Sequence, residues 1–364
     1  MISLEIDSSV TNWVSPPSVT ILRLIYQKQF NLYLFRLKTE MTVEDFMNLL
    51  YDKIRISSKL ASQLSELLGG SQAFWINRYT QFEEELTGNN ERVLSKNLKF
   101  LENLSKIRNI SIEMLLHDFK VSTYEHLMLD YVEGPQIMYS RSQRIEPSPA
   151  NIANWIRNCE LLAERTILEQ PVHIFSNSQL EDQLGEILAL TKVNSINKIV
   201  NKLKKMLLKC GVVLVLSPSE KGNGVSGLTK TLLKKYRLVV VTDRYKNNAA
   251  FWFTLLHELA HCLLHSIVQP IVHYSDEEFT LASLPTNNIF EEEEANSFVE
   301  ELIFTDDLMT ELEDASRSYK KVMRLAVKYD ISSALLVAQI HREKLAPYSH
   351  FRKVYKKTEF NSIL

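Results

Sequence analysis

Apolar residues in the first ninety positions recur at intervals of three and four, the spacing of one helical face. Five short helices are predicted: residues 19–29, residues 32–37, one capped by Thr42, one opened by Ser57 or Ser58, and one containing Phe74 to Ile76. A turn is predicted at Trp13–Pro17. The tight turn between the second and third helices is typical of a helix-turn-helix module, while the periodicity alone fits a plain helical bundle equally well.

Beyond residue 88 the pattern predicts a helical connector, residues 89–182, and a mixed domain, residues 183–364. In the connector, residues 93–104 and 152–163 have helical periodicity. We predict no catalytic chemistry there. The sequence therefore predicts three domains, with residues 1–88 as the first.

Strands are predicted only in the third domain. The apolar run 212–216 reads as a buried strand, residues 238–242 as a second and residues 225–229 as a third. The glycine-bearing loop 221–224 lacks the spacing of a phosphate-binding loop and predicts a hairpin turn. The expected fold is a mainly α N-terminal bundle and connector, followed by an α+β domain with a small sheet beside the helix described next.

The strongest chemical signal lies in residues 251–265, an apolar run interrupted by one glutamate and three histidines at intervals of four. Four residues overshoot one helical turn by about 40°, so His257 and His261 project from one face and can bind one ion. A catalytic zinc takes neutral imidazole nitrogens and keeps one position for water. Glu258 lies beside that position, where it can act as general base. The pattern predicts the zinc helix of a metallopeptidase.

A buried helix whose histidines only pack in the core is the alternative. The neighbours Leu256, Leu259 and Ala260 are uncharged, so Glu258 would then be a lone carboxylate in an apolar helix. Burying such a charge is costly unless a cation compensates it. A metal ion would supply that compensation, and we favour the zinc interpretation.

The third ligand is expected from the downstream run 290–304. A metzincin site would have a histidine six residues after His261, where this chain has Ile267. Counting back by three and four from the apolar stripe that includes Ala295 brings Glu292 onto the same face, with Asn296 one turn later. We predict that Glu292 is the third ligand and that Asn296 accepts the outer N–H of a ligand histidine.

Other residues near the predicted centre receive minor roles. His265 is expected to continue the helix and to pack beside the site. His273 and Tyr274 are candidates for stabilising an oxyanion. The adjoining glutamates 291, 293 and 294 are expected to be a solvated charge run.

Composition adds limits on compartment and partners. The 364 residues include only three cysteines, Cys159, Cys210 and Cys262, without metal-binding spacing. This usage, the lack of a secretion signal and the lack of a membrane-spanning run predict a cytoplasmic protein without a membrane partner. The net charge of −2 combines a basic segment, residues 196–246 with 12 Lys/Arg and 2 Asp/Glu, and an acidic one, residues 271–320 with 2 and 14. We expect these segments to neutralise each other, or else to form a charged cleft.

The C-terminal part resembles the ImmA/IrrE family of zinc-dependent metallo-endopeptidases. The similarity lies in residues 252–265, in Glu292-x-x-Ala-Asn-x-Phe298, in residues 225–229 and in residues 326–332, and it covers most of residues 200–345. The resemblance implies that His257, His261 and Glu292 bind Zn²⁺ and that Glu258 is the catalytic base. It also implies cleavage of a repressor-type or antitoxin-type protein in a stress, mobile-element or phage-defence circuit.

The N-terminal part resembles a HigA-type antidote of the XRE helix-turn-helix class, through residues 13–17, 49–57 and 67–75. The resemblance implies that Thr42–Tyr51 is a recognition helix. However, its expected exposed residues are Glu44, Asp45 and Asn48, and residues 1–90 hold 8 Lys/Arg against 10 Asp/Glu, which argues against DNA binding. Two alternatives stay open: a DNA-binding antidote or autoregulator with a silent or structural peptidase domain, and a module that recruits a protein. The sequence does not fix the oligomeric state, and an oligomer is compatible with it.

Overall fold

The computed structural model describes residues 16–85, 97–121, 123–133, 136–138, 148–193, 195–220, 224–267, 271–274 and 289–360. Most of the predicted turn at 13–17, the start of the predicted helix 93–104 and residues 221–223 of the predicted hairpin lie outside these ranges. The chain divides into two compact units, residues 1–127 and 128–364. This division falls inside the predicted connector. The domain boundaries at residues 88 and 182 stay predictions, since functional domains and compact units need not coincide.

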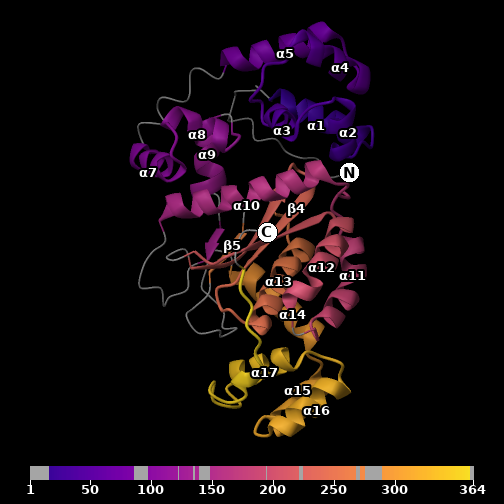
Figure 1. Cartoon of the computed structure of the whole chain (residues 1–364), viewed down its shortest axis with the longest axis vertical. Helices are drawn as coiled ribbons and strands as arrows, with labels where there is room; N and C mark the ends of the chain where they lie inside the picture. The colour runs from indigo at the N-terminus through magenta and orange to yellow at the C-terminus, as the bar shows by residue number, and fades with distance from the viewer. Residues whose placement is uncertain are drawn as a thin grey trace. The chain divides into compact units, whose positions relative to one another are not determined.

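In its described residues the first unit consists of helices joined by turns and short loops (Figure 1). Its helices are α1 (Pro17–Gln27), α2 (Leu32–Lys38), α3 (Val43–Leu50), α4 (Ser58–Leu68), α5 (Gln72–Glu85), α7 (Leu98–Arg108), α8 (Ile112–Asp118) and α9 (Tyr124–Met128), which reaches just past the division. Thr42 caps α3 by accepting a bond from the Asp45 N–H at 3.0 Å, and Ser57 caps α4. The five predicted helices are confirmed.

The helix α3 is covered over its C-terminal half, which has consequences for its expected role in recognition. All five residues from Phe46 to Leu50 are buried. Asn48 is only 8% exposed, and its side-chain oxygen accepts a bond from Lys120 Nζ at 2.8 Å. The expectation that Asn48 is exposed is therefore wrong. The helix-turn-helix assignment stays a prediction.

The second unit contains a five-stranded sheet of order β1-β5-β3-β4-β2. The strands are β1 (Gln136–Met138), β2 (Val212–Ser217), β3 (Val225–Leu232), β4 (Tyr236–Thr242) and β5 (Ile271–Tyr274). β2 is parallel to β4, β3 is antiparallel to both β4 and β5, and β1 is parallel to β5. The three predicted strands are confirmed, and β1 and β5 were not predicted.

The hairpin lies elsewhere than expected. β2 pairs with β4, so the loop 221–224 does not join neighbouring strands and that prediction is wrong. The tight turn is instead residues 233–235 between β3 and β4, where Leu233 and Lys234 have φ of 45° and 61°. Consecutive left-handed residues match the twist of the flanking strands.

Helices cover both faces of the sheet (Figure 1). The helices of the second unit are α10 (Pro149–Glu169), α11 (Asn177–Leu190), α12 (Ile196–Lys209), α13 (Asn248–Leu264), α14 (Ile289–Ile303), α15 (Asp306–Ala315), α16 (Tyr319–Lys328) and α17 (Ser333–Arg342), with single turns η1 (Leu129–Glu133) and η2 (Arg352–Val354). Of these, α10, α12 and α13 pack against the strands. Successive residues of a strand point to opposite faces. Thr229 bonds to Glu258 of α13, whereas Lys230 bonds to Glu160 of α10. Consequently α13 and α10 pack on opposite faces of the sheet at β3.

In the described parts of the chain, no helix has the length and apolar character needed to cross a membrane.

Candidate metal centre

The helix that carries the histidines is the central helix of the second unit. Asn247 caps it by accepting a bond from the Ala250 N–H at 2.9 Å. Every residue from Asn248 to Cys262 is buried, and a helix apolar on all sides is stable only when it is enclosed in this way. It ends at Leu264. His265 has an extended backbone as C-cap, so the expectation that it continues the helix is wrong.

Three side chains predicted as ligands converge on one point. Glu292 places one oxygen 3.1 Å from His257 Nε2 and the other 2.9 Å from His261 Nε2, and the two Nε2 atoms are 3.0 Å apart. One donor atom from each residue lies within 4.8 Å of the others. Donors 2.0–2.1 Å from a tetrahedral zinc lie about 3.3–3.4 Å from one another. The spacing is therefore close to that of three corners of a zinc site.

A hydrogen bond to Asn296 fixes the position of one proton on His257. His257 Nδ1 lies 3.0 Å from Asn296 Oδ1, and an amide oxygen can only accept a hydrogen bond. Nδ1 therefore carries a proton, and Nε2 faces His261 and Glu292. A histidine whose Nδ1 proton is held by an outer partner can bind a metal ion through Nε2 when that nitrogen is unprotonated. The structure thus brings Asn296 to the position expected for it.

Burial keeps the second histidine neutral. His261 is fully buried, and this burial, opposed by the hydrogen bond to Glu292, lowers its pKa to about 4. Its contact with Glu292 is thus no ion pair near neutral pH. Two neutral imidazoles and one carboxylate are a donor set that zinc accepts, and the residues present fit that ion.

The side chain of Glu258 extends from α13 toward β3. Its side chain is fully buried, and Thr229 Oγ1 donates to its Oε2 at 2.6 Å. A Cβ added to Gly227 would lie 2.0 Å from Glu258 Oε1 and 2.7 Å from Cδ. Only glycine leaves room for this carboxylate against the strand.

Thr229 and Gly227 are the site residues that reasoning from the sequence missed as such. Both lie in the segment 225–229 that carries part of the family resemblance, but no spacing rule connects them to a glutamate some thirty residues later. Their proximity arises from the packing of α13 on β3. The resemblance was the one available signal.

His265 ties the two helices of the site together from outside it. Its Nε2 lies 3.0 Å from the backbone oxygen of Glu291, at the start of α14. Glu293 and Glu294 are exposed, in keeping with a solvated charge run. The side chains of His273 and Tyr274 lie outside the described part of the structure, so their candidate role stays a prediction.

Comparison with known proteins identifies a family resemblance for this part of the chain. Residues 209–341 match the family model of the IrrE N-terminal-like domain, Peptidase_M78. This range runs from β2 to α17 and includes the residues of the candidate centre. No curated protein and no solved structure matches the chain. The match supports a metallopeptidase-type domain in the second unit.

Proposed function

We propose that the chain is a zinc-dependent, site-specific endopeptidase. One observation carries the proposal: His257, His261 and Glu292 converge on a single point, with their nitrogens and oxygens 2.9–3.1 Å apart. His257, His261 and Glu292 would hold the ion. A zinc ion bound there would polarise a peptide carbonyl and lower the pKa of water.

The residues around that point have complementary roles in the proposal. Glu258 is the general base, and its Oε1, which lies over Gly227, accepts the proton. Thr229 holds the other carboxylate oxygen and so limits the rotation of the side chain. Asn296 keeps His257 in its metal-binding tautomer. A purely structural zinc site would have no use for Glu258, which favours an active enzyme.

The substrate class in the proposal is a repressor-type or antitoxin-type protein of the cytoplasm. It rests on the family resemblance and on the helical N-terminal unit, which we propose recruits the protein to be cleaved. The burial of Phe46 to Leu50 in α3 and the net acidic charge of residues 1–90 favour a protein partner over DNA for this unit.

The test uses a variant that keeps the ligands and removes the base. Products of neighbouring genes are incubated with wild type and with Glu258→Gln, and new termini are identified by mass spectrometry. Wild type is expected to produce a single cut that the variant does not, while elemental analysis finds equal zinc in both. Zinc-loaded wild type that cuts none of these products, or a variant that cuts equally well, would contradict the proposal.

A further inference from the structure

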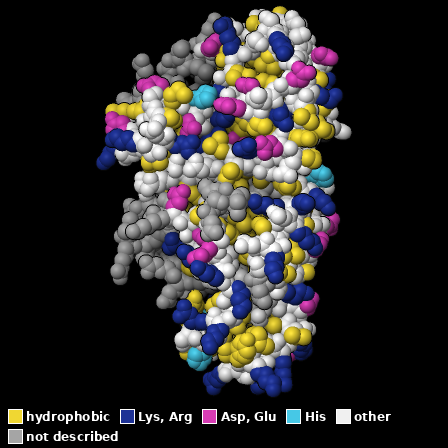
Figure 2. All heavy atoms as spheres, in the orientation of Figure 1, with side chains coloured by type: hydrophobic (Ala, Val, Ile, Leu, Met, Phe, Trp, Pro, Cys, Tyr) yellow, Lys and Arg dark blue, Asp and Glu magenta, His cyan; other side chains and the backbone are white. Residues whose placement is uncertain are grey.

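Basic side chains gather at the end of the second unit that includes α16 and η2 (Figure 2). Residues 317–357 contain 11 Lys/Arg and 2 Asp/Glu, a net charge of +9 in a chain whose net charge is −2. Ten of the eleven cations are exposed. Five of the exposed ones form two short groups, one on α16 and one on η2: Lys320, Lys321, Arg324, Arg352 and Lys353. This group is called the basic end below.

Within the described residues, the cations of the basic end have no ion-pair partner. Other basic residues nearby are paired: Lys328 with Glu311, Arg342 with Glu300 and Lys357 with Glu359. For the five cations of the basic end, the described ranges offer no carboxylate within 4.0 Å. Each of the two groups of exposed cations, on α16 and on η2, contributes to a local positive potential.

Aromatic rings lie among these cations. The rings of Tyr319 and Phe351 are 6.2 Å apart, which places the start of α16 beside the residues that precede Arg352. The Arg352 guanidinium lies 5.3 Å from the centre of the Tyr348 ring. Tyr319 and Tyr348 are 53% and 43% exposed. Both rings therefore offer exposed aromatic surface within the basic end, and Tyr348 lies next to a cation.

We propose that the basic end, together with Tyr319 and Tyr348, binds single-stranded nucleic acid. Cations that track phosphates and aromatic rings that stack on bases are the two elements of such sites. Exposed rings favour a single strand, because the bases of a duplex are already stacked on one another. This site is separate from the metal centre, and the proposal does not depend on the peptidase activity.

The neighbouring helix limits the size of the site. α15 packs against α16, and its exposed residues include Asp306, Asp307, Glu313 and Asp314. A nucleic-acid strand that continued from the basic end over α15 would be repelled by these carboxylates. We therefore expect a short footprint of a few nucleotides rather than a long track.

The test measures fluorescence anisotropy of a labelled 20-residue oligo-dT with the full chain, in 50 to 200 mM salt. The variant Lys320→Gln/Lys321→Gln/Arg352→Gln/Lys353→Gln is expected to bind at least tenfold more weakly. Its slope of log affinity against log salt should fall by about 3, since each lost phosphate contact removes about 0.7. The matched control neutralises four exposed lysines along α12, Lys198, Lys202, Lys205 and Lys209, and should change affinity less than twofold.

A second variant separates stacking from charge. Tyr319→Leu/Tyr348→Leu keeps apolar packing and removes the aromatic faces, so affinity should fall about fivefold or more while the salt slope stays unchanged. Circular dichroism and the unfolding temperature check that the variants fold. The proposal is overturned if wild type does not bind at 50 mM salt, if the α12 control loses as much affinity, or if a 20-base-pair duplex or phosphatidylserine vesicles bind more tightly than the single strand.

Discussion

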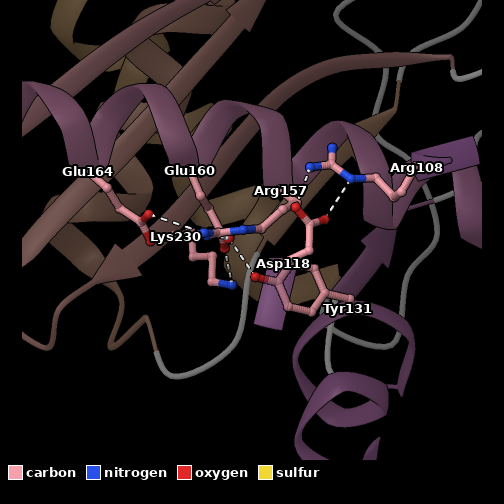
Figure 3. Close-up of polar contacts among 7 residues, drawn as sticks. All are labelled: Arg108, Asp118, Tyr131, Arg157, Glu160, Glu164 and Lys230. Atoms are coloured by element: carbon pink, nitrogen blue, oxygen red, sulfur yellow. Dashed lines mark hydrogen bonds and ion pairs between the residues drawn. The ribbon is translucent and has the colours of Figure 1, made fainter. Parts of the chain in front are cut away.

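Two buried polar clusters lie on opposite faces of the sheet, and they differ in how their charges are arranged. On the face of the sheet that α10 covers, Arg157 donates to Glu160 at 2.9 Å and to Glu164 at 3.1 and 3.3 Å. Lys230 and Tyr131 also donate to Glu160 (Figure 3). In this ionic cluster two cations face two carboxylates, each of these contacts joins a donor to an acceptor, and the formal charges cancel.

On the opposite face, which α13 covers, the groups of the candidate metal centre are not compensated in this way. His257 Nε2 lies 3.1 Å from one carboxylate oxygen of Glu292, and Nε2 of the neutral His261 lies 2.9 Å from the other. Both Nε2 atoms must be unprotonated to bind a metal ion, and in that form acceptor groups face one another and repel unless a cation lies between them. The comparison teaches that burial and charge alone do not mark a functional site. The distinguishing feature is whether the hydrogen-bonding groups and charges of the cluster are all compensated within the cluster.

Removing one cation from the ionic cluster should have the largest effect on stability. Arg157→Met leaves Glu160 and Glu164 buried with less compensation, and breaking a buried pair in this way costs about 3–5 kcal/mol. The midpoint of chemical denaturation measures the loss. The control is Arg165→Met on the same helix, whose partner Glu169 is exposed with it, and its midpoint should not move. If both variants unfold at the wild-type midpoint, the ionic cluster is not a stabilising element.

Removing one charge from the candidate metal centre should lower zinc affinity without lowering stability. Glu292→Gln removes the charged ligand, and zinc affinity should fall by more than about 100-fold, since even an outer-shell partner contributes 10- to 100-fold. In the presence of a chelator, however, its unfolding temperature should equal or exceed that of wild type, because glutamine keeps an oxygen that can accept from His261 Nε2 and no longer buries a carboxylate charge. Elemental analysis and calorimetry give the two readouts.

The control for this pair is Glu293→Gln, an exposed neighbour on the same helix, which should keep both zinc and stability. A large loss of stability of the chelated Glu292→Gln protein would show that the two clusters are of the same kind.

The candidate metal centre could be predicted from the sequence far better than the ionic cluster on the other face of the sheet. The spacing of His257 and His261 and the stripe through Glu292 depend only on helical geometry, which is local, and the structure brings these residues together. The charges of α10 fall at 157, 160 and 164, a spacing that a sequence reading assigns to a solvated helix face. Their burial depends on Lys230, which reaches them from β3, a contact that no local pattern encodes.

Strand order shows the same limit. The strands β2, β3 and β4 are continuous apolar runs or lie between turn signals, so their existence is predictable. Their pairing is not, because β2 skips β3 to join β4, and the short β1 and β5 carry too few residues to show a period. Gly227 and Thr229 depend on this pairing, which is why their role emerged only from the folded chain.

Removing the outer partner of His257 should weaken the metal cluster without abolishing it. Asn296→Ala deletes the oxygen that holds the Nδ1 proton, and we expect zinc affinity to fall about 10- to 100-fold. Asn296→Asp supplies an acceptor at the same place and should retain most of the affinity. Competition with a zinc-binding dye measures both, and equal loss in both variants would mean that the tautomer is not fixed by this contact.

An effect on rate alone is expected for the strand between the two clusters. Thr229→Val keeps the shape of the side chain and removes the bond to Glu258 Oε2, so Glu258 loses one restraint while the ligands stay in place. Hydrogen bonds to charged groups contribute about 1.5–3 kcal/mol, and we expect kcat for the cleaved protein to fall at least tenfold with KM and zinc content unchanged. Thr229→Ser, which restores the hydroxyl, should recover most of the rate. If Ser and Val behave alike, the threonine only fills space between helix and strand, and the carboxylate is positioned by its packing over Gly227 instead.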